Sequence, residues 1–289
     1  MVAWVDNAAQ GSPRRAQAAF RFREGAHASP GKVAYTYRQC AESAPAPFPH
    51  PLELFAVAAA EVCDGDKCLV PIPLDLPEDA ESELAAFLSE AERQRAARFH
   101  RPRDRQRYIV AHGRLRQLLA QRLEIGPEQV ALGYNRYGKP ELLGPQAASG
   151  WRFNISYSDA AEGSLALCAL SRRGRIGVDV ESVRRLDDPE TLARQFFSPR
   201  EYALYRRLDP DDRPMGFFNC WTRKEAFVKA LGTGLSHDLT DFDVSLTPGM
   251  PARLLRVGGL SGERCGWRLE SIGPAGGRVA AVVTEHTGS

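Results

Sequence analysis

An order of elements that occurs twice along the chain constrains the fold more than any other feature. Each time, a capped helix precedes a longer helix, and short strand-like segments follow. The first capped helix is LSEAERQRAARF (88–99), where serine precedes glutamate by three positions, as in a capping box. The second is FSPREYALYRRL (197–208), which begins with serine, proline and glutamate in the same way. The repeat predicts two similar α+β halves in a pseudo-two-fold arrangement, with a cleft between them.

The strand-like segments are short and largely apolar, and they are separated by Gly, Ser and charged turns. We predict strands at 68–75, 129–134, 151–158, 164–171, 175–182, 241–246, 252–257, 266–272 and 278–285. The seam falls near 171–175, so that the N-terminal half is 66–172 and the C-terminal half is 173–289. Residues 1–65 show no lasting periodicity and are expected to form a partly ordered extension.

Composition excludes few classes of protein. A net charge of +2 is too small to mark the whole chain as a nucleic-acid or membrane binder, although ten arginines lie between Arg93 and Arg122. The best apolar run, Leu52–Val62, contains two glutamates and is too short to span a bilayer. The cysteines form no CxxC pair and are expected to be reduced thiols: Cys40, Cys63, Cys68, Cys168, Cys220 and Cys265. We therefore expect a cytoplasmic protein.

The predicted helix WTRKEAFVKALGTGL (221–235) carries several charges close together. Because residues four apart lie on one face of a helix, Trp221, Glu225 and Lys229 form one stripe, and Lys224 lies beside it. The other side is apolar, and glycine ends the helix. The pattern fits a charged stripe that faces a cleft, and it also fits a solvated helix with an ordinary Glu–Lys pair.

Asp179 and Glu181 lie two apart in the segment IGVDVES, so both carboxylates are expected on the same face of a strand. Two neighbouring carboxylates repel unless a cation lies between them. Mg²⁺ prefers such oxygen ligands and keeps positions for water and phosphate. The valines of this segment favour a buried strand, whereas the alternative is an exposed strand face with two solvated acids.

Three further signals each admit more than one interpretation. The turn RYGKPEL, with Lys139, is also common as a purely structural loop. The segment WRFNISYSD places hydroxyl groups at a strand end, where they either bind phosphate or pair across strands. The arginine-rich segment fits a solvated helix face, an anion site or a nucleic-acid surface. His112 within it is expected to be packed in the core.

In chain order, the elements YGKP, FNISYS, GVDVES and WTRKEAFVKALG resemble the two-domain monomeric 4′-phosphopantetheinyl transferases, which activate peptide synthetases and polyketide or fatty-acid synthases. The resemblance runs from about Asp66 to Glu285, and SEAERQRAARF also fits the family's N-terminal half. It implies that the chain transfers the 4′-phosphopantetheine arm of coenzyme A to a serine of an apo acyl or peptidyl carrier protein and releases 3′,5′-ADP. It further implies a monomer without a nucleic-acid or membrane partner.

The resemblance also implies a catalytic arrangement. Asp179, Glu181 and Glu225 would surround Mg²⁺, which bridges the diphosphate. Glu225 would also be the general base, taking the serine proton directly or through a metal-bound water, because no histidine lies in a matched motif. The other helix residues would bind coenzyme A, with phosphate contacts from Lys224 and the catalytic Lys229 and a pocket wall from Trp221.

The nucleotide end of coenzyme A would lie against the N-terminal half. The implied contacts are Lys139 and Pro140 at the adenine or its phosphates, Ser156 and Tyr157 near the 3′-phosphate, and Arg95 and Arg107 at the nucleotide end. The family usually has histidine where this chain has Tyr157, which replaces a titratable donor by a neutral phenol.

Two other functions stay open from the sequence. One is a non-catalytic homologue that holds coenzyme A without transfer, which the change at Tyr157 allows. The other is a nucleic-acid-binding protein that uses the arginine-rich helices. That function would show phosphate contacts with a steep salt dependence, and it leaves the acidic pair without a role.

Overall fold

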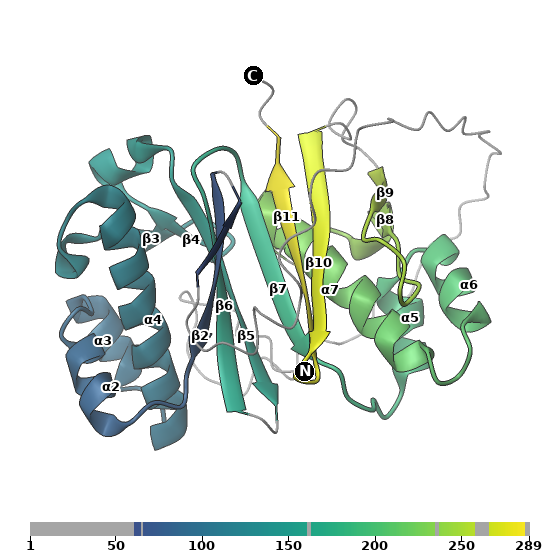
Figure 1. Ribbon diagram of the computed structural model, residues 1–289, viewed down its shortest axis with the longest axis horizontal. Coiled ribbons are helices and arrows are strands. Elements are labelled where there is room, and N and C mark those ends of the chain that lie inside the picture. The colour runs from purple at the N-terminus through teal and green to yellow at the C-terminus, as the bar shows by residue number, and fades with distance from the viewer. Residues whose placement is uncertain (1–60, 65, 161–162, 235–236, 258–265, 287–289) are drawn as a thin grey trace. The chain divides into compact units, whose positions relative to one another are not determined.

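A computed structural model describes the chain in the ranges 61–64, 66–160, 163–234, 237–257 and 266–286, which all belong to the compact unit Pro47–Ser289 (Figure 1). The expected extension, apart from its last few residues, lies outside these ranges, as do Cys40 and Cys265. Within the described ranges, no helix combines the length and the apolar character that a membrane span needs.

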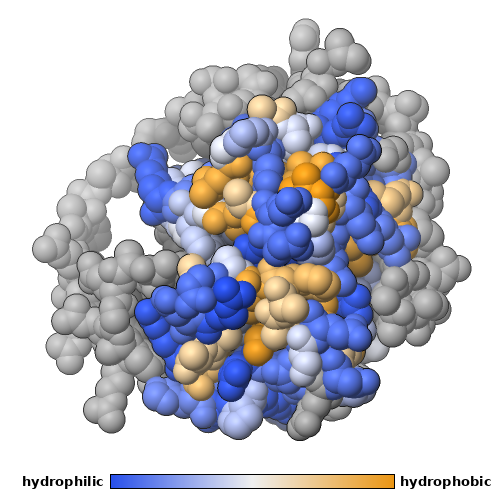
Figure 2. Space-filling model, turned by 90° about the vertical axis from the view of Figure 1, so that its left-hand side faces the viewer, coloured by the Kyte–Doolittle hydropathy of each residue, from blue (hydrophilic) through white to orange (hydrophobic). Residues whose placement is uncertain are grey.

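The N-terminal half is built on a four-stranded antiparallel sheet. Its strands, in spatial order, are β1 (Val62–Asp64), β2 (Lys67–Pro73), β6 (Gly163–Ser171) and β5 (Arg152–Ala160). The helices α2 (Glu78–Ala85), α3 (Glu90–Ala96) and α4 (Pro102–Leu123) pack on one face of this sheet (Figure 1). Hydrophilic residues dominate the outer side of this half, with apolar side chains gathered near its middle (Figure 2). Much of the arginine-rich segment therefore has the solvated outer face that is usual for an amphipathic helix.

A short hairpin and the second sheet complete the scaffold. The hairpin pairs β3 (Leu132–Tyr134) with β4 (Pro140–Leu142). The second sheet has the antiparallel order β10 (Trp267–Ala275), β11 (Arg278–Glu285) and β7 (Ile176–Ser182). The remaining elements are α5 (Pro189–Phe196), α6 (Pro199–Arg207), α7 (Arg213–Leu231), β8 (Phe242–Val244) and β9 (Leu254–Val257).

Apolar side chains fill the space between the two sheets. Leu69, Leu167 and Ala169 come from the first sheet, and they share one buried cluster with residues of the second sheet such as Val178 and Val180. The opposite face of β7 meets helix α7. Because β7 is covered on both faces, polar side chains on its helix side are withdrawn from bulk water, which raises the energetic cost of any charge there.

Strands β5 and β7 are joined by side chains that bond across to the neighbouring strand. Asn154 Oδ1 accepts a hydrogen bond from Val178 N at 2.8 Å, and Ser156 Oγ accepts one from Val180 N at 3.4 Å. Farther along, a hydroxyl–hydroxyl bond of 2.9 Å joins Ser158 to a serine of β7. Every second residue of this part of FNISYS, namely Asn154, Ser156 and Ser158, thus bonds to β7. Cross-strand pairing, one of the two interpretations of this segment, is therefore confirmed.

Both halves contain the same local arrangement of a capping-box glutamate and a buried cation. Glu92 closes a capping box at α3 and pairs with Arg116 of α4 at 2.7 Å. Glu201 closes a capping box at α6 and pairs with Lys224 of α7, also at 2.7 Å. In each half the cation also donates to backbone carbonyls of the turn after its helix. The structure thus confirms a mixed α and β fold in which this local pattern occurs twice, while the division into two halves, the pseudo-two-fold axis and the cleft stay predictions.

One expectation about the cysteines is wrong. Cys63 of β1 and Cys68 of β2 face each other across the hairpin, with Cα atoms 4.1 Å apart, and form a disulfide. Sequence spacing does not reveal this pairing, because the five-residue separation brings the thiols together only once the two strands pair. Cys168 and Cys220 are buried and free, as expected.

Candidate functional site

Close packing of α7 on β7 creates the candidate site. At Gly177 a Cβ atom would lie 2.1 Å from Ala226 O and 2.2 Å from Ala230 N, so any side chain here would force the helix away. Successive side chains alternate along a strand, and therefore Asp179 and Glu181 point to the same side as the missing side chain of Gly177. The prediction that these two carboxylates share a face, beneath α7, is confirmed.

Asp179 is the centre of a buried hydrogen-bond network. Its side chain is almost entirely enclosed, and Oδ1 accepts hydrogen bonds from Lys229 Nζ at 2.7 Å and from Ser156 Oγ at 2.9 Å. Lys229 Nζ also donates to Ser156 Oγ at 2.9 Å, which closes a triangle of three side chains. The second carboxylate oxygen, Asp179 Oδ2, is buried and has no hydrogen-bond partner among the residues that the structure describes.

Glu181 is oriented by the ring of Trp221. The indole Nε1 donates to Glu181 Oε1 at 3.2 Å, and the ring is held by an edge contact with Phe196 at 5.2 Å. Burial, followed by the nearby charge of Asp179, raises the pKa of Glu181 to about 7. Trp221 therefore contacts an acid of the site rather than forming only an apolar wall.

Glu225 lies one helical turn from Trp221 and one from Lys229, as the stripe on the helix requires. Its Oε1 is buried and lacks a hydrogen-bond partner within the described part of the chain. Burial and the charge of Asp179 raise the pKa of Glu225 to about 7. Burial acts against the ammonium of Lys229, but the charges of Asp179 and Glu225 outweigh it and raise the Lys229 pKa.

This donor set fits a hard divalent cation. Buried polar atoms are nearly always hydrogen-bonded, so two orphaned carboxylate oxygens on facing elements call for a positive partner. The charge of Asp179 acts on both Glu181 and Glu225, and the ammonium of Lys229 interacts with all three acids. Mg²⁺ takes carboxylate oxygens and retains positions for other ligands. Asp179, Glu181 and Glu225 are therefore the residues that could hold such an ion.

The placement of Lys224 corrects the sequence-based assignment. Its side chain is fully buried, and its ammonium pairs with Glu201 at 2.7 Å. The same nitrogen donates to Leu239 O at 2.5 Å and Phe242 O at 2.7 Å. Residue 224 lies about 100° around the helix from residue 225, on a side that meets the core of the C-terminal half. All three protons of the ammonium have acceptors there, which disfavours the predicted phosphate contact of Lys224 and indicates a role in the stability of the fold.

Lys139 is bonded to backbone carbonyls near the end of α7. Its Nζ donates to Lys229 O at 2.7 Å, to Ile176 O at 3.0 Å and to Ala230 O at 3.4 Å. Burial lowers the pKa of this amine to about 8. With its protons committed to backbone carbonyls, the side chain is not displayed to an adenine or a phosphate. Pro140 follows directly as the first residue of β4 and pairs with Tyr134 of β3.

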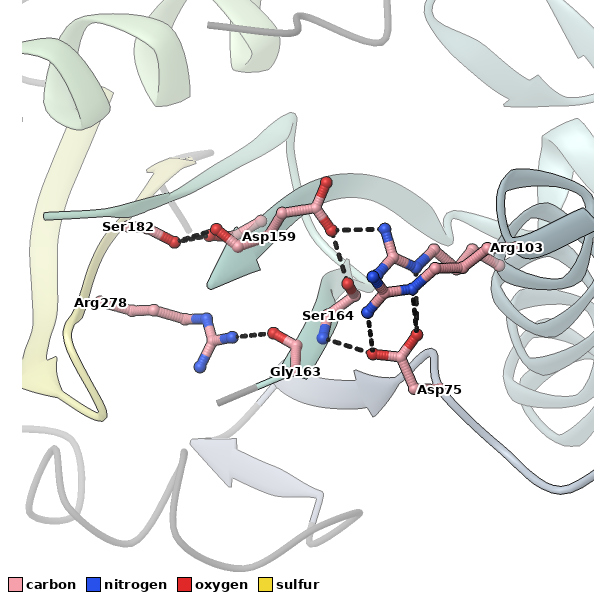
Figure 3. Close-up of polar contacts among 9 residues, drawn as sticks. Asp75, Arg103, Asp159, Gly163, Ser164, Ser182 and Arg278 are labelled. Atoms are coloured by element: carbon pink, nitrogen blue, oxygen red, sulfur yellow. Dashed lines mark hydrogen bonds and ion pairs between the residues drawn. The ribbon is translucent and has the colours of Figure 1, made fainter. Parts of the chain in front are cut away.

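The arginines predicted at the nucleotide end have partners within the protein. Arg107 is 14% exposed and binds Asp75 at 3.1 Å and Asp159 at 2.8 Å. Figure 3 shows Asp75 and Asp159 together with Arg103 and Ser164, whose backbone N–H donates to Asp75 at 2.9 Å. Burial alone would raise the pKa of Asp75, but hydrogen bonds from both arginines and from this N–H lower it to about 2. An anionic ligand would have to compete with these carboxylates.

Arg95 is placed differently from Arg107. Its guanidinium lies over the ring of Tyr108, 5.7 Å from the ring centroid. His112 is stacked on the same ring at 4.0 Å and meets Glu92 at 3.1 Å, so it is a packed core histidine as expected. The predicted contact of Arg95 with a nucleotide stays a prediction.

Ser156 and Tyr157 point to opposite faces of β5. The Ser156 hydroxyl belongs to the network of Asp179 and Lys229, whereas Tyr157 packs against the apolar cluster of the N-terminal half. Neighbouring residues on a strand cannot reach one phosphate from the same face. The structure therefore places Ser156 in the acidic site and Tyr157 on the other face of β5, and their predicted contact with the 3′-phosphate stays a prediction.

Sequence reasoning missed two residues that shape the site. Gly177 permits the close approach of α7, and a small residue two positions before Asp179 on the same strand face was the available signal. Asn135 was not singled out, although its Nδ2 donates to Gly232 O at the end of α7 at 2.9 Å. Nothing in the local sequence links a hairpin turn to a helix that lies almost one hundred residues later.

Two family models match separate segments of the chain. The family model described as "4′-phosphopantetheinyl transferase superfamily" matches residues 175–283, which contain β7 and α7. A second family model, "4′-phosphopantetheinyl transferase, N-terminal", matches residues 77–168.

Individual relatives carry the same description. The chain is 41% identical over 217 residues to the 4′-phosphopantetheinyl transferase HetI of Nostoc sp., covering 75% of this chain and 86% of the relative. It is 32% identical over 168 residues to a 4′-phosphopantetheinyl transferase of Bacillus subtilis, covering 57% and 70%. It is 28% identical over 171 residues to the 4′-phosphopantetheinyl transferase Sfp of Bacillus subtilis, covering 59% and 72%.

Proposed function

Because this chain belongs to the 4′-phosphopantetheinyl transferase superfamily, it is an enzyme that transfers phosphopantetheine from coenzyme A to carrier proteins, and we propose that the transfer takes place at the acidic site between β7 and α7. The observation that carries this placement is the pair of buried oxygens, one of Asp179 and one of Glu225, that have no hydrogen-bond partner among the residues the structure describes. An enzyme that acts on a diphosphate needs positive charge beside the phosphates. The three carboxylates of this site carry more negative charge than the ammonium of Lys229 neutralises, so the site can accept a further cation.

We propose Mg²⁺ as the ion that Asp179, Glu181 and Glu225 hold. When bound, Mg²⁺ would offset the charge of the diphosphate and of the leaving oxygen. The hydrogen bond from Trp221 Nε1 fixes the orientation of the Glu181 carboxylate toward the site. Residues that orient metal ligands in this way typically affect metal affinity by about 10–100-fold when changed.

Glu225 is the general base in this proposal. The serine oxygen of the carrier protein attacks the phosphorus next to the pantetheine arm, and the bond from that phosphorus to the 3′,5′-ADP oxygen breaks. The serine proton passes to the Glu225 carboxylate, and the leaving group keeps the electron pair. In the protein without a bound ion, burial and the charge of Asp179 raise the pKa of Glu225, which makes its carboxylate a better proton acceptor than a solvated glutamate.

Lys229 contributes a fixed positive charge beside Asp179, and Arg184 lies 3.9 Å from Glu181. Two of the three protons of the Lys229 ammonium are donated to Asp179 and Ser156, which set the direction of the ammonium. We propose that the remaining proton is donated to a phosphate oxygen of coenzyme A. Ser156 supports the reaction by orienting Lys229 and Asp179, in place of a direct contact with the 3′-phosphate.

The other functions considered from the sequence fit less well. The complete set of acids and Lys229 disfavours a homologue that only binds coenzyme A. The carboxylates of Asp75 and Asp159 neutralise Arg107, which disfavours a nucleic-acid surface at that point. The monomeric state, the cytoplasmic location and the 3′,5′-ADP product stay predictions.

The test is mass spectrometry of several apo carrier proteins incubated with the enzyme, coenzyme A and Mg²⁺. The expected product is a carrier protein with one added phosphopantetheine group on its serine. Asp179→Asn serves as the matched control, because it keeps the shape of the side chain and removes the charge. Full transfer by that variant would place the reaction elsewhere in the protein.

A further inference from the structure

The end of helix α7 is held by a turn from the other half of the protein. The β3–β4 turn presents Lys139, whose ammonium donates to the carbonyls of Lys229 and Ala230 in the last turn of α7. Asn135, at the start of the same turn, donates through Nδ2 to Gly232 O at 2.9 Å. Carbonyl groups in the last turn of a helix lack donors within the helix, so these side chains satisfy groups that would otherwise be orphaned.

The turn itself is shaped for this contact. Asn135 Oδ1 accepts hydrogen bonds from Tyr137 N at 2.9 Å and from Lys139 N at 3.0 Å, which fixes the loop that carries the lysine. Gly232 ends α7 with φ +72°, and a Cβ there would lie 3.2 Å from Asn135 Nδ2 and 3.3 Å from Lys139 Cδ. The two segments therefore fit closely around the helix end.

The ammonium of Lys139 also reaches β7. It donates to Ile176 O at 3.0 Å, three residues before Asp179 on the same strand. A single half-buried cation thus joins the strand that carries Asp179 to the backbone of Lys229, while Gly177 allows the two elements to touch. A cation at a helix C-terminus is also favoured by the helix dipole.

We propose that Lys139 and Asn135 are positioning residues for the transferase reaction: they cap α7 and hold Lys229 in register with Asp179. This inference rests on the proposed function of the acidic site. It assigns the lysine of the GKP turn a role in the geometry of the acidic site rather than in nucleotide binding. The N-terminal half then controls the alignment of charged groups that all belong to β7 and α7.

The test compares Lys139→Met and Asn135→Asp with Arg136→Met. Methionine keeps the length of the lysine stem and removes its donors, and aspartate keeps the Oδ1 acceptor while removing the donor to Gly232. Arg136 is an exposed cation of the same turn that lies over Tyr137 at 4.6 Å, so its variant controls for a lost charge. Kinetic constants, coenzyme A binding by calorimetry and hydrogen–deuterium exchange of residues 225–232 are measured for each variant.

We expect Lys139→Met to lower kcat by about 10–100-fold, because small displacements of catalytic groups have effects of that size. The dissociation constant of coenzyme A should change by less than about threefold, since a positioning residue acts mainly on the transition state. Asn135→Asp should lower kcat in the same direction and by a smaller factor. Exchange at the end of α7 should become faster in both variants and stay unchanged in Arg136→Met.

Several outcomes would overturn the proposal. Weaker coenzyme A binding with a normal kcat would show that Lys139 is a nucleotide ligand. An unchanged kcat and unchanged hydrogen–deuterium exchange in both variants would show that these residues do not cap α7. If Lys139→Met does not fold, the same measurements on Asn135→Asp test the proposal. An inactive wild-type protein would refute the proposed function, whereas the exchange data would still show whether the turn holds the helix end.

Discussion

Replacing Lys224 by methionine should destabilise the protein strongly, although the change adds no polar group. The side chains of Lys224 and Glu201 are 0% and 1% exposed, so solvent does not screen their interaction. Breaking a buried ion pair from one side leaves an uncompensated charge and costs about 3–5 kcal/mol. The carbonyls of Leu239 and Phe242 also lose their donor, which places the expected loss in the upper part of that range.

Urea unfolding followed by tryptophan fluorescence measures this loss as a change in the free energy of unfolding. Arg206→Met is the control, because that side chain is 63% exposed and lies 3.7 Å from its acidic partner. It should change the stability by less than about 0.5 kcal/mol. The double variant Lys224→Met/Glu201→Gln should recover part of the loss, since glutamine removes the buried charge and still accepts from Val244 N.

The competing expectation is that Lys224 binds the phosphates of coenzyme A. In that case Lys224→Met would unfold within about 1 kcal/mol of the wild type and would bind coenzyme A more weakly. Such a result would refute the placement of the ammonium in the core. Both measurements are made on the same variant, so the two explanations are separated directly.

Three further predictions concern the acidic site and the N-terminal core. Glu225→Gln should lower kcat by about 10²–10⁴-fold with little change in coenzyme A affinity; a near-normal kcat would exclude it as the base. Removal of the metal ion with EDTA should abolish transfer. Trp221→Phe keeps a ring but lacks the donor to Glu181, so it should raise the Mg²⁺ concentration for half-maximal activity by about tenfold. An unchanged Mg²⁺ dependence would show that this hydrogen bond does not support metal binding. Burial opposes ionisation of Glu92, but hydrogen bonds from His112 and Ser89 and the charge of Arg116 lower its pKa from 4.5 to about 2. A lowered carboxyl pKa stabilises the folded state above pH 4.5, so the free energy of unfolding should fall by about 3 kcal/mol as the pH falls towards 2. The stability of Glu92→Gln, measured over the same pH range, should lack this decrease.

Local sequence signals were sufficient to predict most elements of the fold. The capping boxes at Ser89 and Ser198, the proline at position 102 and the glycine at 232 mark helix ends because they act on the backbone within a few residues. The strand segments followed from their apolar runs and turn residues in the same way. The short strands β1 and β4 were not predicted as separate strands, since three residues are too few to show a periodicity.

The candidate site was predicted only as far as residue spacing reaches. The positions of Asp179 and Glu181 on one strand face, and of Glu225 and Lys229 on one helix face, follow from the periods of the two elements. Spacing also placed Lys224 next to this stripe, yet a shift of one residue turns its side chain towards Glu201. Periodicity assigns residues to faces, but it does not say which face meets which core.

Tertiary structure decided the roles that depend on contacts between distant segments. Lys139 reaches Ala230 across ninety-one residues of chain, and Ser156 reaches Asp179 across twenty-three. Burial then sets what each group can do: it commits the protons of Lys139 and Lys224 to carbonyls, and it leaves oxygens of Asp179 and Glu225 without a partner among the described residues. The order of amino acids specifies which chemical groups are present and which of them share a face of a strand or helix. Only the packing of α7 against β7 and the β3–β4 turn decided which of them became a site, because desolvation and hydrogen-bond partners exist only in the folded chain.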